Sequence, residues 1–206
     1  MGAVSRSLPD RVGKVNDGRH ASRERNRDAV VDALLDLYED GVLNPGAQEV
    51  AARSGVSRRS VFRYFDDMDE LCRTAIDRHT ARVSHLFEVE GLGEGPVADR
   101  IDRLVEQRTR LFEAIAPVRR ITQLRAPFQP IIATELSGAR KRLRRQLEQH
   151  FAPELDELKA EERDERLAVI DVLASFESFD LLRSAQGLSQ ARASEAMRHG
   201  LRALIG

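Results

Sequence analysis

Cysteine is almost absent from this sequence of 206 residues, in which Cys72 is the single one. One cysteine cannot form an internal disulfide and excludes a cysteine-rich zinc site, which agrees with a reducing cytoplasm as the expected location. The chain also lacks an apolar run of about 18 residues, the length that a membrane helix needs. Its N-terminus has no apolar segment typical of a signal peptide, so we expect no membrane partner.

Catalytic motifs and metal-ligand clusters are missing as well. None of the five histidines has a partner at metal-binding spacing. The glycines at 91, 93 and 95 follow no predicted strand and so do not form a dinucleotide loop. The acids Asp66, Asp67, Asp69 and Glu70 could suggest a magnesium site, but the start of a capped helix favours acids in the same way. We therefore predict no enzymatic activity, no metal and no cofactor.

Helical periodicity dominates the chain, and strand-like alternation does not occur. The first 21 residues are polar and glycine-containing, and we expect them to form a mobile basic arm. The helices that we predict after the arm cover residues 22–40, 47–54, 58–65, 67–90, 97–116, 118–124, 131–151, 163–185 and 189–205.

Positive charge is concentrated near the N-terminus, although the net charge of the chain is only −1. Residues 53–63 carry four arginines and no acid, and residues 1–27 carry seven basic side chains against three acidic ones. Such a distribution indicates a local anionic partner. Charge alone would favour ordinary solvated faces over a bound partner.

The most informative segment is AQEVAARSGVSRRSVFRYFDDMDEL, residues 47–71. Two short helices are joined by Gly55, Val56 and Ser57, which supply a tight turn, an apolar plug and an N-cap. Val61 and Phe65 belong to the core in this interpretation. The side chains left to point outward or toward the rim of the helix are Arg58, Arg59, Ser60, Phe62, Arg63 and Tyr64. They suit the major groove of DNA, whereas the alternative is a small helical subdomain that packs without reading DNA.

The Gly-Val-Ser turn, the run Phe-Arg-Tyr-Phe and the capped helix reaching Glu70-Leu71 together resemble the TetR family of transcriptional regulators. The resemblance extends over roughly residues 22–82. It implies an all-α fold in which an N-terminal three-helix domain with a helix-turn-helix is linked by a long helix to a C-terminal ligand-binding and dimerisation domain. The residues that it implies at DNA are Gln48 on phosphate, Arg58, Arg59, Ser60 and Arg63 on base edges or phosphates, and Phe62 and Tyr64 lining the groove.

Three positions depart from the family pattern. Pro45-Gly46 stands where a serine or threonine is usual, Met68 replaces a lysine, and Phe62 replaces a tyrosine. The arginines that could compensate by contacting backbone or minor groove are Arg19, Arg23, Arg25 and Arg27.

The expected domains are the arm at 1–21, the DNA-binding domain at 22–66, the connecting helix at 67–90 and the C-terminal domain at 95–206. The predicted helix at 163–185 is apolar around almost its whole circumference, so it needs a second partner surface. A second copy of the chain is the simplest one, and a two-fold dimer requires a palindromic operator in double-stranded DNA. A monomer with a tighter core is the alternative.

A small effector molecule of apolar or amphipathic character is the last expected partner. Its candidate contacts, for each of which plain core is the simpler explanation, are Phe112, Ile115, Leu124, Phe128, Ile131, Thr134 and Phe176. The resemblance thus implies a repressor that an effector releases from DNA, although the sequence does not separate a repressor from an activator. A second hypothesis is an all-helical small-molecule-binding protein or enzyme that has lost specific DNA binding.

Overall fold

The computed structural model describes the backbone of residues 12–205 and the side chains from residue 20 onward. This part of the chain is helical throughout and contains no strand, which confirms the predicted all-α class. It divides into two compact units, of which the first ends at Ile76 and the second begins at Asp77. None of the helices in the described range is both long and apolar enough to cross a membrane.

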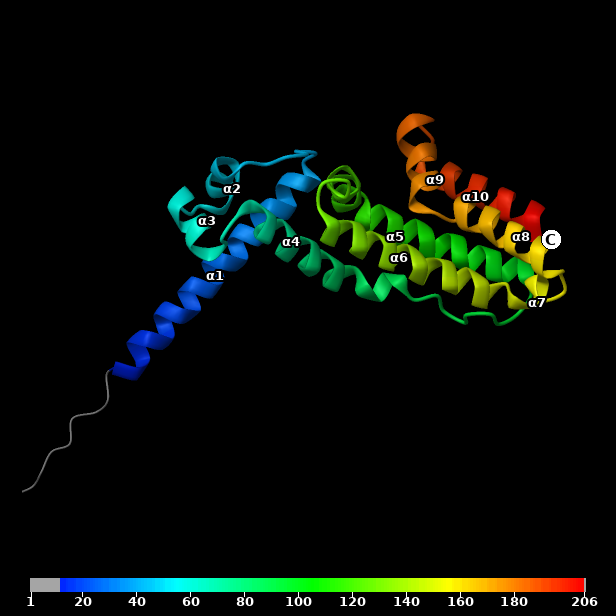
Figure 1. Cartoon of the computed structure of the whole chain (residues 1–206), viewed down its shortest axis with the longest axis horizontal. Helices are drawn as coiled ribbons and strands as arrows, with labels where there is room; N and C mark the ends of the chain where they lie inside the picture. Colours follow the sequence, from blue (N-terminus) through cyan, green and yellow to red (C-terminus); the bar gives the residue numbers. More distant parts are fainter. Residues whose placement is uncertain (1–11, 206) are drawn as a thin grey trace, which may run out of the picture. The chain divides into compact units, whose positions relative to one another are not determined.

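The first unit contains α1 (Val12–Glu39), α2 (Ala47–Ser54), α3 (Arg58–Tyr64) and the start of α4 (Met68–Val83) (Figure 1). The boundaries of α2 agree with the prediction. The start of α1 does not, because the helix begins ten residues before the expected Ser22. Extending an existing helix costs far less than nucleating one, so Gly13 and Gly18 do not stop it. The rest of the predicted arm, residues 1–11, lies outside the described residues.

The core of the first unit lies between α1 and the three helices that follow it. The hydroxyl of Tyr38 on α1 lies 3.3 Å from the Sγ of Cys72 on α4, inside the core. Cys72 is therefore a packed core residue, as its place in an apolar stripe predicted. The fully or almost fully buried side chains of this core include Val30, Val31, Leu34, Leu35, Tyr38, Val50, Ala51, Val61, Phe65, Leu71, Cys72 and Ala75.

The second unit is a helical bundle. Its elements are the 3-10 turn η1 (Ser84–Phe87), α5 (Val97–Arg125), α6 (Pro130–His150), α7 (Ala152–Leu155), α8 (Ala160–Leu173), α9 (Phe176–Asp180), the π-helical turn η2 (Leu181–Ala185) and α10 (Gln190–Ile205). α5 packs against α6, α9 and α10, and α8 packs against α6 and α10. The α-helical part of the connecting segment is shorter than the predicted 67–90, since α4 ends at Val83.

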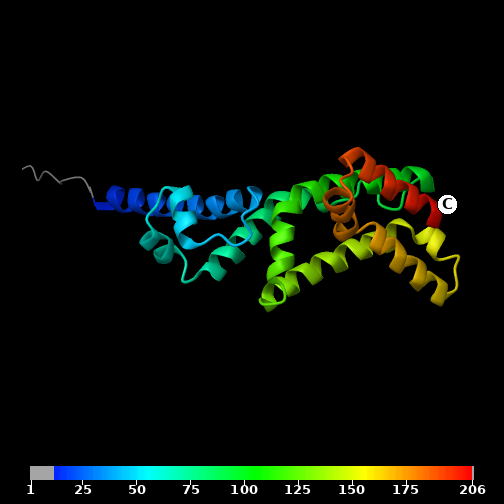
Figure 2. The ribbon, with the colours of Figure 1, turned by 90° about the horizontal axis from the view of Figure 1, so that it is seen from above.

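Pro117 lies inside α5, where we had predicted that the helix would stop. Proline has no amide proton and so cannot bond to the carbonyl four residues earlier, at Glu113. The helix nevertheless continues, because Phe112 before the proline and Val118 and Ile121 after it are all buried. Figure 2 shows the ribbon of α5 changing direction in its second half, as expected for a proline kink.

The predicted helix at 163–185 is interrupted after Leu173. Ser175 has an extended backbone, and its hydroxyl accepts a hydrogen bond from the amide of Ser178 at 3.2 Å, so it caps a new helix, α9. The chain then widens into η2, where the amide of Gln186 bonds to the carbonyl of Leu181 at 3.0 Å. The sequence pattern did not reveal this break, because the segment is apolar on both sides of the single serine that forms the cap.

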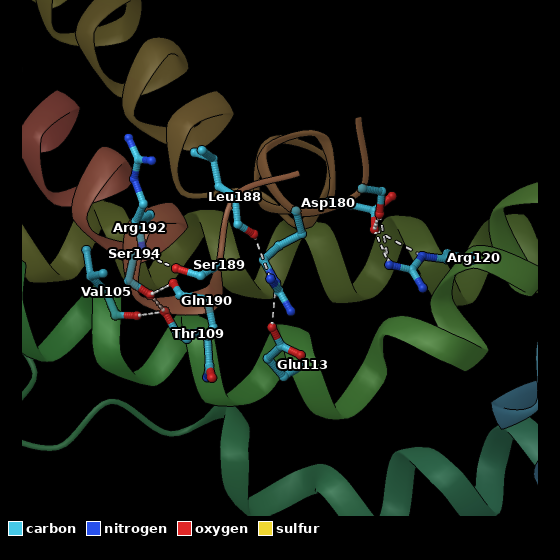
Figure 3. A network of polar contacts seen from close by, with 12 residues as sticks. Val105, Thr109, Glu113, Arg120, Asp180, Leu188, Ser189, Gln190, Arg192 and Ser194 are labelled. Carbon is cyan, nitrogen blue, oxygen red and sulfur yellow. Dashed lines mark hydrogen bonds and ion pairs between the residues drawn. The ribbon is translucent and has the colours of Figure 1, made fainter. Parts of the chain in front are cut away.

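Polar contacts attach α9, η2 and α10 to α5 (Figure 3). Arg183 donates to Glu113 at 2.9 Å and to the carbonyl of Leu188 at 2.7 Å. Further along α5, the hydroxyls of Thr109 and Ser194 lie 2.7 Å apart. Arg120 and Asp180 form an ion pair of 2.6 Å on the other side of Pro117. Polar contacts from the continuous segment α9–η2 thus reach α5 on both sides of the kink.

A buried histidine at the end of α6 joins this helix to the start of α5 and to the loop before it. The Nδ1 of His150 accepts a hydrogen bond from the amide of Gly93 at 3.0 Å, so its Nε2 carries the proton and donates to the carbonyl of Arg100 at 2.8 Å. Gly93 has a φ of +79°, and a Cβ there would lie 3.3 Å from the carbonyl of Gln149. Burial lowers the pKa of His150, and nearby arginine charges add to this effect. The neutral imidazole therefore fastens the loop before α5 to the end of α6.

Candidate nucleic-acid interface and effector cavity

The turn between α2 and α3 has the geometry that its three residues predicted. Gly55 adopts a φ of +72°, in the left-handed region that favours glycine. Val56 is half-buried, and the hydroxyl of Ser57 accepts a hydrogen bond from the amide of Ser60 at 3.1 Å. Since this turn fixes the direction in which α3 leaves α2, it determines which side chains of α3 face solvent.

The inner side of α3 is anchored in the core, as predicted. Val61 is 1% exposed and Phe65, just after the helix, is 2% exposed. The guanidinium of Arg27 on α1 lies over the ring of Phe65, 4.7 Å from its centroid. These contacts hold a helix of only seven residues, which would not be stable by itself.

The outer side of α3 presents cations and an aromatic ring to solvent. Arg58, Arg59 and Arg63 are exposed, and Phe62 is 44% exposed. Among the residues that the structure describes, no carboxylate forms an ion pair with any of these three arginines. The face therefore has free positive charge, which an anionic partner can neutralise.

Two other predicted contacts border this face. Ser60 is half-buried, and its hydroxyl lies 2.9 Å from that of Ser57, so it belongs to the cap as well as to the surface. Gln48 is exposed in the first turn of α2, where backbone amides favour anions. One of these amides is already used, because Glu49 accepts a hydrogen bond from the amide of Gly46 at 2.8 Å.

Tyr64 differs from the expectation that it points outward, since it is only 8% exposed. It lies three residues after Val61 and hence on the same, inner side of the helix. Its hydroxyl accepts a hydrogen bond from Arg63 at 3.0 Å. Burial raises the pKa of Tyr64, but the hydrogen bonds from Arg63 and Asn26 and the arginine charges lower it by more. Tyr64 thus orients Arg63 and does not itself present a face to solvent.

The contribution of α1 to this surface was only partly anticipated. Arg23 and Asn26 lie close enough to Tyr64 to affect its hydroxyl, and Arg27 lies on Phe65. The spacing of Arg23 and Arg27 by four residues puts both on one face of the helix, which is the signal that could have indicated it. The side chain of Arg19 lies outside the described residues.

The acids that could have suggested magnesium instead cap α4. The carboxylate of Asp67 accepts a hydrogen bond from the amide of Glu70 at 2.7 Å, and that of Glu70 accepts one from the amide of Asp66 at 2.6 Å. Asp67 thus caps the helix as the capping-box spacing predicted, whereas Glu70 binds the amide one residue before the cap. Within the described part of the chain, no group of three or more histidine, cysteine or acidic side chains could hold a metal.

The predicted effector contacts fall into two groups. Phe112, Ile115 and Phe176 line one small cavity of the second unit, with the rings of Phe112 and Phe176 packed edge to face at 5.8 Å. The other four are exposed around the turn from α5 to α6, where Phe128 is 84% exposed, and they do not line the cavity. These four are Leu124, Phe128, Ile131 and Thr134. The sequence could not place them, because the kinked α5 carries its last turns away from the cavity.

The cavity lies between α5, α6 and the residues that join α8 to α9. Its free volume is about 40 Å³. Pockets that hold drug-sized ligands measure roughly 300–1,000 Å³, so any larger ligand would have to move the walls. The apolar walls end at charged side chains, which are Arg119, Arg140, Asp171 and Glu177.

The comparisons with known proteins agree with this architecture of a helix-turn-helix unit followed by a helical bundle. Residues 37–75 match the family model described as "Bacterial regulatory proteins, tetR family". The HTH-type transcriptional repressor Rv3405c of Mycobacterium tuberculosis is 31% identical over 122 residues, which are 58% of this chain and 62% of that protein. The HTH-type transcriptional regulator Mb3439c of Mycobacterium bovis matches over the same shares with the same identity. The match thus spans less than two thirds of these relatives.

Solved structures resemble the chain over most of its length. A transcriptional regulator from Rhodococcus sp. Rha1 superposes with a TM-score of 0.65 at 22% identity and covers 89% of this chain and 95% of its own. A tetR-family transcriptional regulator from Streptomyces coelicolor gives 0.66 at 21% identity, with coverage of 88% and 80%. At these identities the likeness concerns the fold.

Fold, motif and sequence matches define the class as all-helical proteins with an N-terminal helix-turn-helix. Within this class, residues 37–75 match the tetR family of bacterial regulatory proteins. The relatives compared are named as regulators and not as enzymes, in agreement with the prediction of no enzymatic activity.

Proposed function

We propose that this protein is a dimeric, sequence-specific DNA-binding repressor of the cytoplasm, which occupies a palindromic operator and leaves it when a small apolar or amphipathic molecule binds. The observation that carries the proposal is the outer face of α3. Three exposed arginines, which have no ion-pair partner among the described residues, stand there on a short helix whose inner side is fixed in the core.

In the proposed complex, α3 enters the major groove. Arg58 and Arg63 suit the acceptor atoms of guanine, because a guanidinium can donate two parallel hydrogen bonds. Arg59, Ser60 and Gln48 contact phosphates or nearby bases and so set the register. Phe62 contacts the groove through its exposed ring, and Tyr64 acts through Arg63, which it binds.

The second unit supports the proposed dimer. Val169 and Val172 on α8 and Leu181 on η2 are 47%, 53% and 55% exposed. Apolar side chains exposed on neighbouring elements are typical of a surface that another protein covers. A second copy related by a two-fold axis would cover them and would also present two α3 helices to one side of the DNA.

The proposed release requires that the effector bind one state of the repressor more tightly than the other. The cavity of the second unit supports such a site, because its free volume is about 40 Å³ and a larger ligand must displace side chains or helices that line it, among them α5, α6 and α9. Movement of these elements in response to a ligand is the coupling that the proposal needs.

Selection of fragments from sheared genomic DNA at near-physiological salt tests the proposal. We expect the intact protein to enrich a few palindromic sites. The double variant Arg58→Ala, Arg63→Ala should enrich none while remaining folded. The control variant Arg110→Ala, Arg145→Ala removes the same charge from exposed positions of the second unit and should behave like the intact protein.

Weak binding without enriched sites, equal for both double variants, would contradict the proposal. It would favour a helical small-molecule-binding protein that does not read DNA. A reporter gene placed behind an enriched site distinguishes repression from activation, and we expect its expression to rise when the protein is removed.

A further inference from the structure

The charges around the cavity of the second unit narrow the kind of molecule that it can take. Apolar side chains form its inner walls, including Phe87, Phe112, Leu143 and Phe176. The lining also includes two guanidiniums and two carboxylates, which we call the charged rim, namely those of Arg119, Arg140, Asp171 and Glu177. A ligand in this cavity would therefore have an apolar body and a charged or polar end.

Both carboxylates of the rim already have partners from this chain. One oxygen of Glu177 accepts hydrogen bonds from Arg119 at 2.9 Å and from Gln123 at 2.8 Å. Asp171 lies 3.6 Å from Arg140 and 3.5 Å from Arg144. If Arg119 turned toward a ligand, Glu177 would keep its hydrogen bond from Gln123.

Positive charge is in excess at this site. Arg108 lies directly behind the wall, is fully buried and donates to the carbonyl of Leu143 at 3.1 Å. Its other hydrogen bonds go to the amide oxygens of Gln107 and Gln146, and within the described residues no carboxylate forms an ion pair with it. Four guanidiniums therefore stand against two carboxylates, and they belong to Arg108, Arg119, Arg140 and Arg144. A cationic ligand would add to this excess, whereas an anionic ligand would reduce it.

Two buried hydrogen-bond donors of these arginines are unused in the described part of the chain. They are the Nε atoms of Arg108 and Arg119, which have no hydrogen-bond partner there. Buried donors are usually satisfied in folded proteins, so each unused one requires an explanation. Arg119 is the accessible one of the two, because it lines the cavity with its guanidinium 5.7 Å above the ring of Phe176.

We infer that the effector is a small monocarboxylate with an apolar ring or short chain. Its carboxylate binds to Arg119, and its apolar body lies against the rings of Phe112 and Phe176. The inference rests on the proposed effector-controlled function and specifies the ligand of that site. Because the free volume is about 40 Å³, a compact molecule that separates the walls slightly fits better than a long chain.

Three probes that share one aromatic body and differ in charge test the inference. They are phenylacetate, 2-phenylethanol and 2-phenylethylamine, each titrated calorimetrically into the full-length protein without DNA. We expect phenylacetate to bind about tenfold or more tightly than the alcohol, because an ion pair with Arg119 adds a charge-assisted hydrogen bond. We expect no measurable binding of the amine.

Variants of α5 show whether Arg119 is the contact. Arg119→Gln should reduce the affinity for phenylacetate about tenfold and leave that for the alcohol unchanged. Arg119→Lys should retain part of the preference for the carboxylate. The matched control is Arg120→Gln, at the next position, where the side chain pairs with Asp180 and does not line the cavity. It should bind all three probes like the intact protein.

Several results would overturn the inference. They are tighter binding of the amine, equal binding of alcohol and carboxylate, no binding of any probe, or an equal loss for all probes in a folded Arg119→Gln variant. The genomic selection on the same preparation separates the two ideas. If operators are enriched but the protein does not bind phenylacetate, only the inferred ligand class is refuted. If the protein binds phenylacetate but enriches no operator, only the proposed function as a DNA-binding regulator is refuted.

Discussion

Most arginines of the second unit have carboxylate partners, whereas the three on the outer face of α3 have none among the described residues. In the second unit, Arg119, Arg183 and Arg198 connect helices that are distant in the sequence. On α3, the same side chain type faces solvent. The difference shows that the number of arginines says little about function, and that the presence or absence of a carboxylate partner says much more.

The largest expected effect concerns the core that holds α3 in place. Phe65→Ala should lower the free energy of unfolding of the first unit by about 3–5 kcal/mol, because it removes a buried aromatic ring. Urea unfolding followed by circular dichroism measures this change. Phe62→Ala, three positions earlier on the exposed side, should cost less than about 0.5 kcal/mol. Equal destabilisation by both variants would mean that the two sides of α3 are not distinct.

The next effect sharpens the contrast between free and paired arginines. Arg58→Ala should weaken binding to a selected operator by about 1–3 kcal/mol and leave folding intact, because it removes a direct contact to DNA. Where Arg58 contacts phosphate, the slope of log affinity against log salt should also fall by about one.

The control for this change is Arg110→Ala, which removes an exposed arginine paired with Glu106 at 3.4 Å in the second unit. Fluorescence anisotropy of a labelled operator over a series of salt concentrations measures both variants. An Arg58→Ala protein that binds as tightly as the Arg110→Ala protein would remove Arg58 from the interface.

Two serine caps offer a matched comparison between the units. Ser57 caps α3 and Ser175 caps α9, with hydroxyl-to-amide distances of 3.1 and 3.2 Å. Substitution of either by alanine should cost about 1 kcal/mol of stability. Only Ser57→Ala should also weaken operator binding, since Ser57 fixes the start of the reading helix. An equal loss of DNA affinity in the Ser175→Ala protein would show that α9 influences the interface.

The smallest expected effect is a dependence of stability on pH that belongs to the second unit. Burial lowers the pKa of both His150 and His79, so the folded state favours their neutral forms. The stability that this provides is complete above the unfolded pKa of about 6.5 and is lost as pH falls through the lowered folded value.

Thermal unfolding between pH 8 and pH 5 measures this effect. We expect the melting temperature to decrease below about pH 6.5 and this decrease to be smaller in His150→Gln, which lacks the group that titrates. An identical pH profile in the variant would exclude His150 as its source.

Local chemistry explains where sequence reasoning succeeded. The left-handed Gly55, the cap at Ser57 and the capping of α4 by Asp67 and Glu70 involve residues at most four positions apart, so their pattern is visible in the sequence. The division of α3 into an inner side with Val61 and Phe65 and an outer side with arginines follows from helical periodicity.

Long-range packing explains where it failed. Tyr64 was expected at the surface, but α1 and Arg63 enclose it. Pro117 was expected to end a helix that buried neighbours keep continuous. Leu124 and Phe128 were expected near Phe112 and Phe176, but they lie beyond the kink of α5 and are exposed. Each of these outcomes depends on residues far away in the chain.

The sequence by itself determined the all-helical class, the helix-turn-helix and the outward arginines of α3, because turns, caps and periodicity are local properties of the chain. Only the tertiary structure decided which arginines lack a carboxylate partner, which aromatic rings meet in one cavity and where α5 bends. These features arise when segments dozens of residues apart pack together, and the energy of that packing overrides local preference.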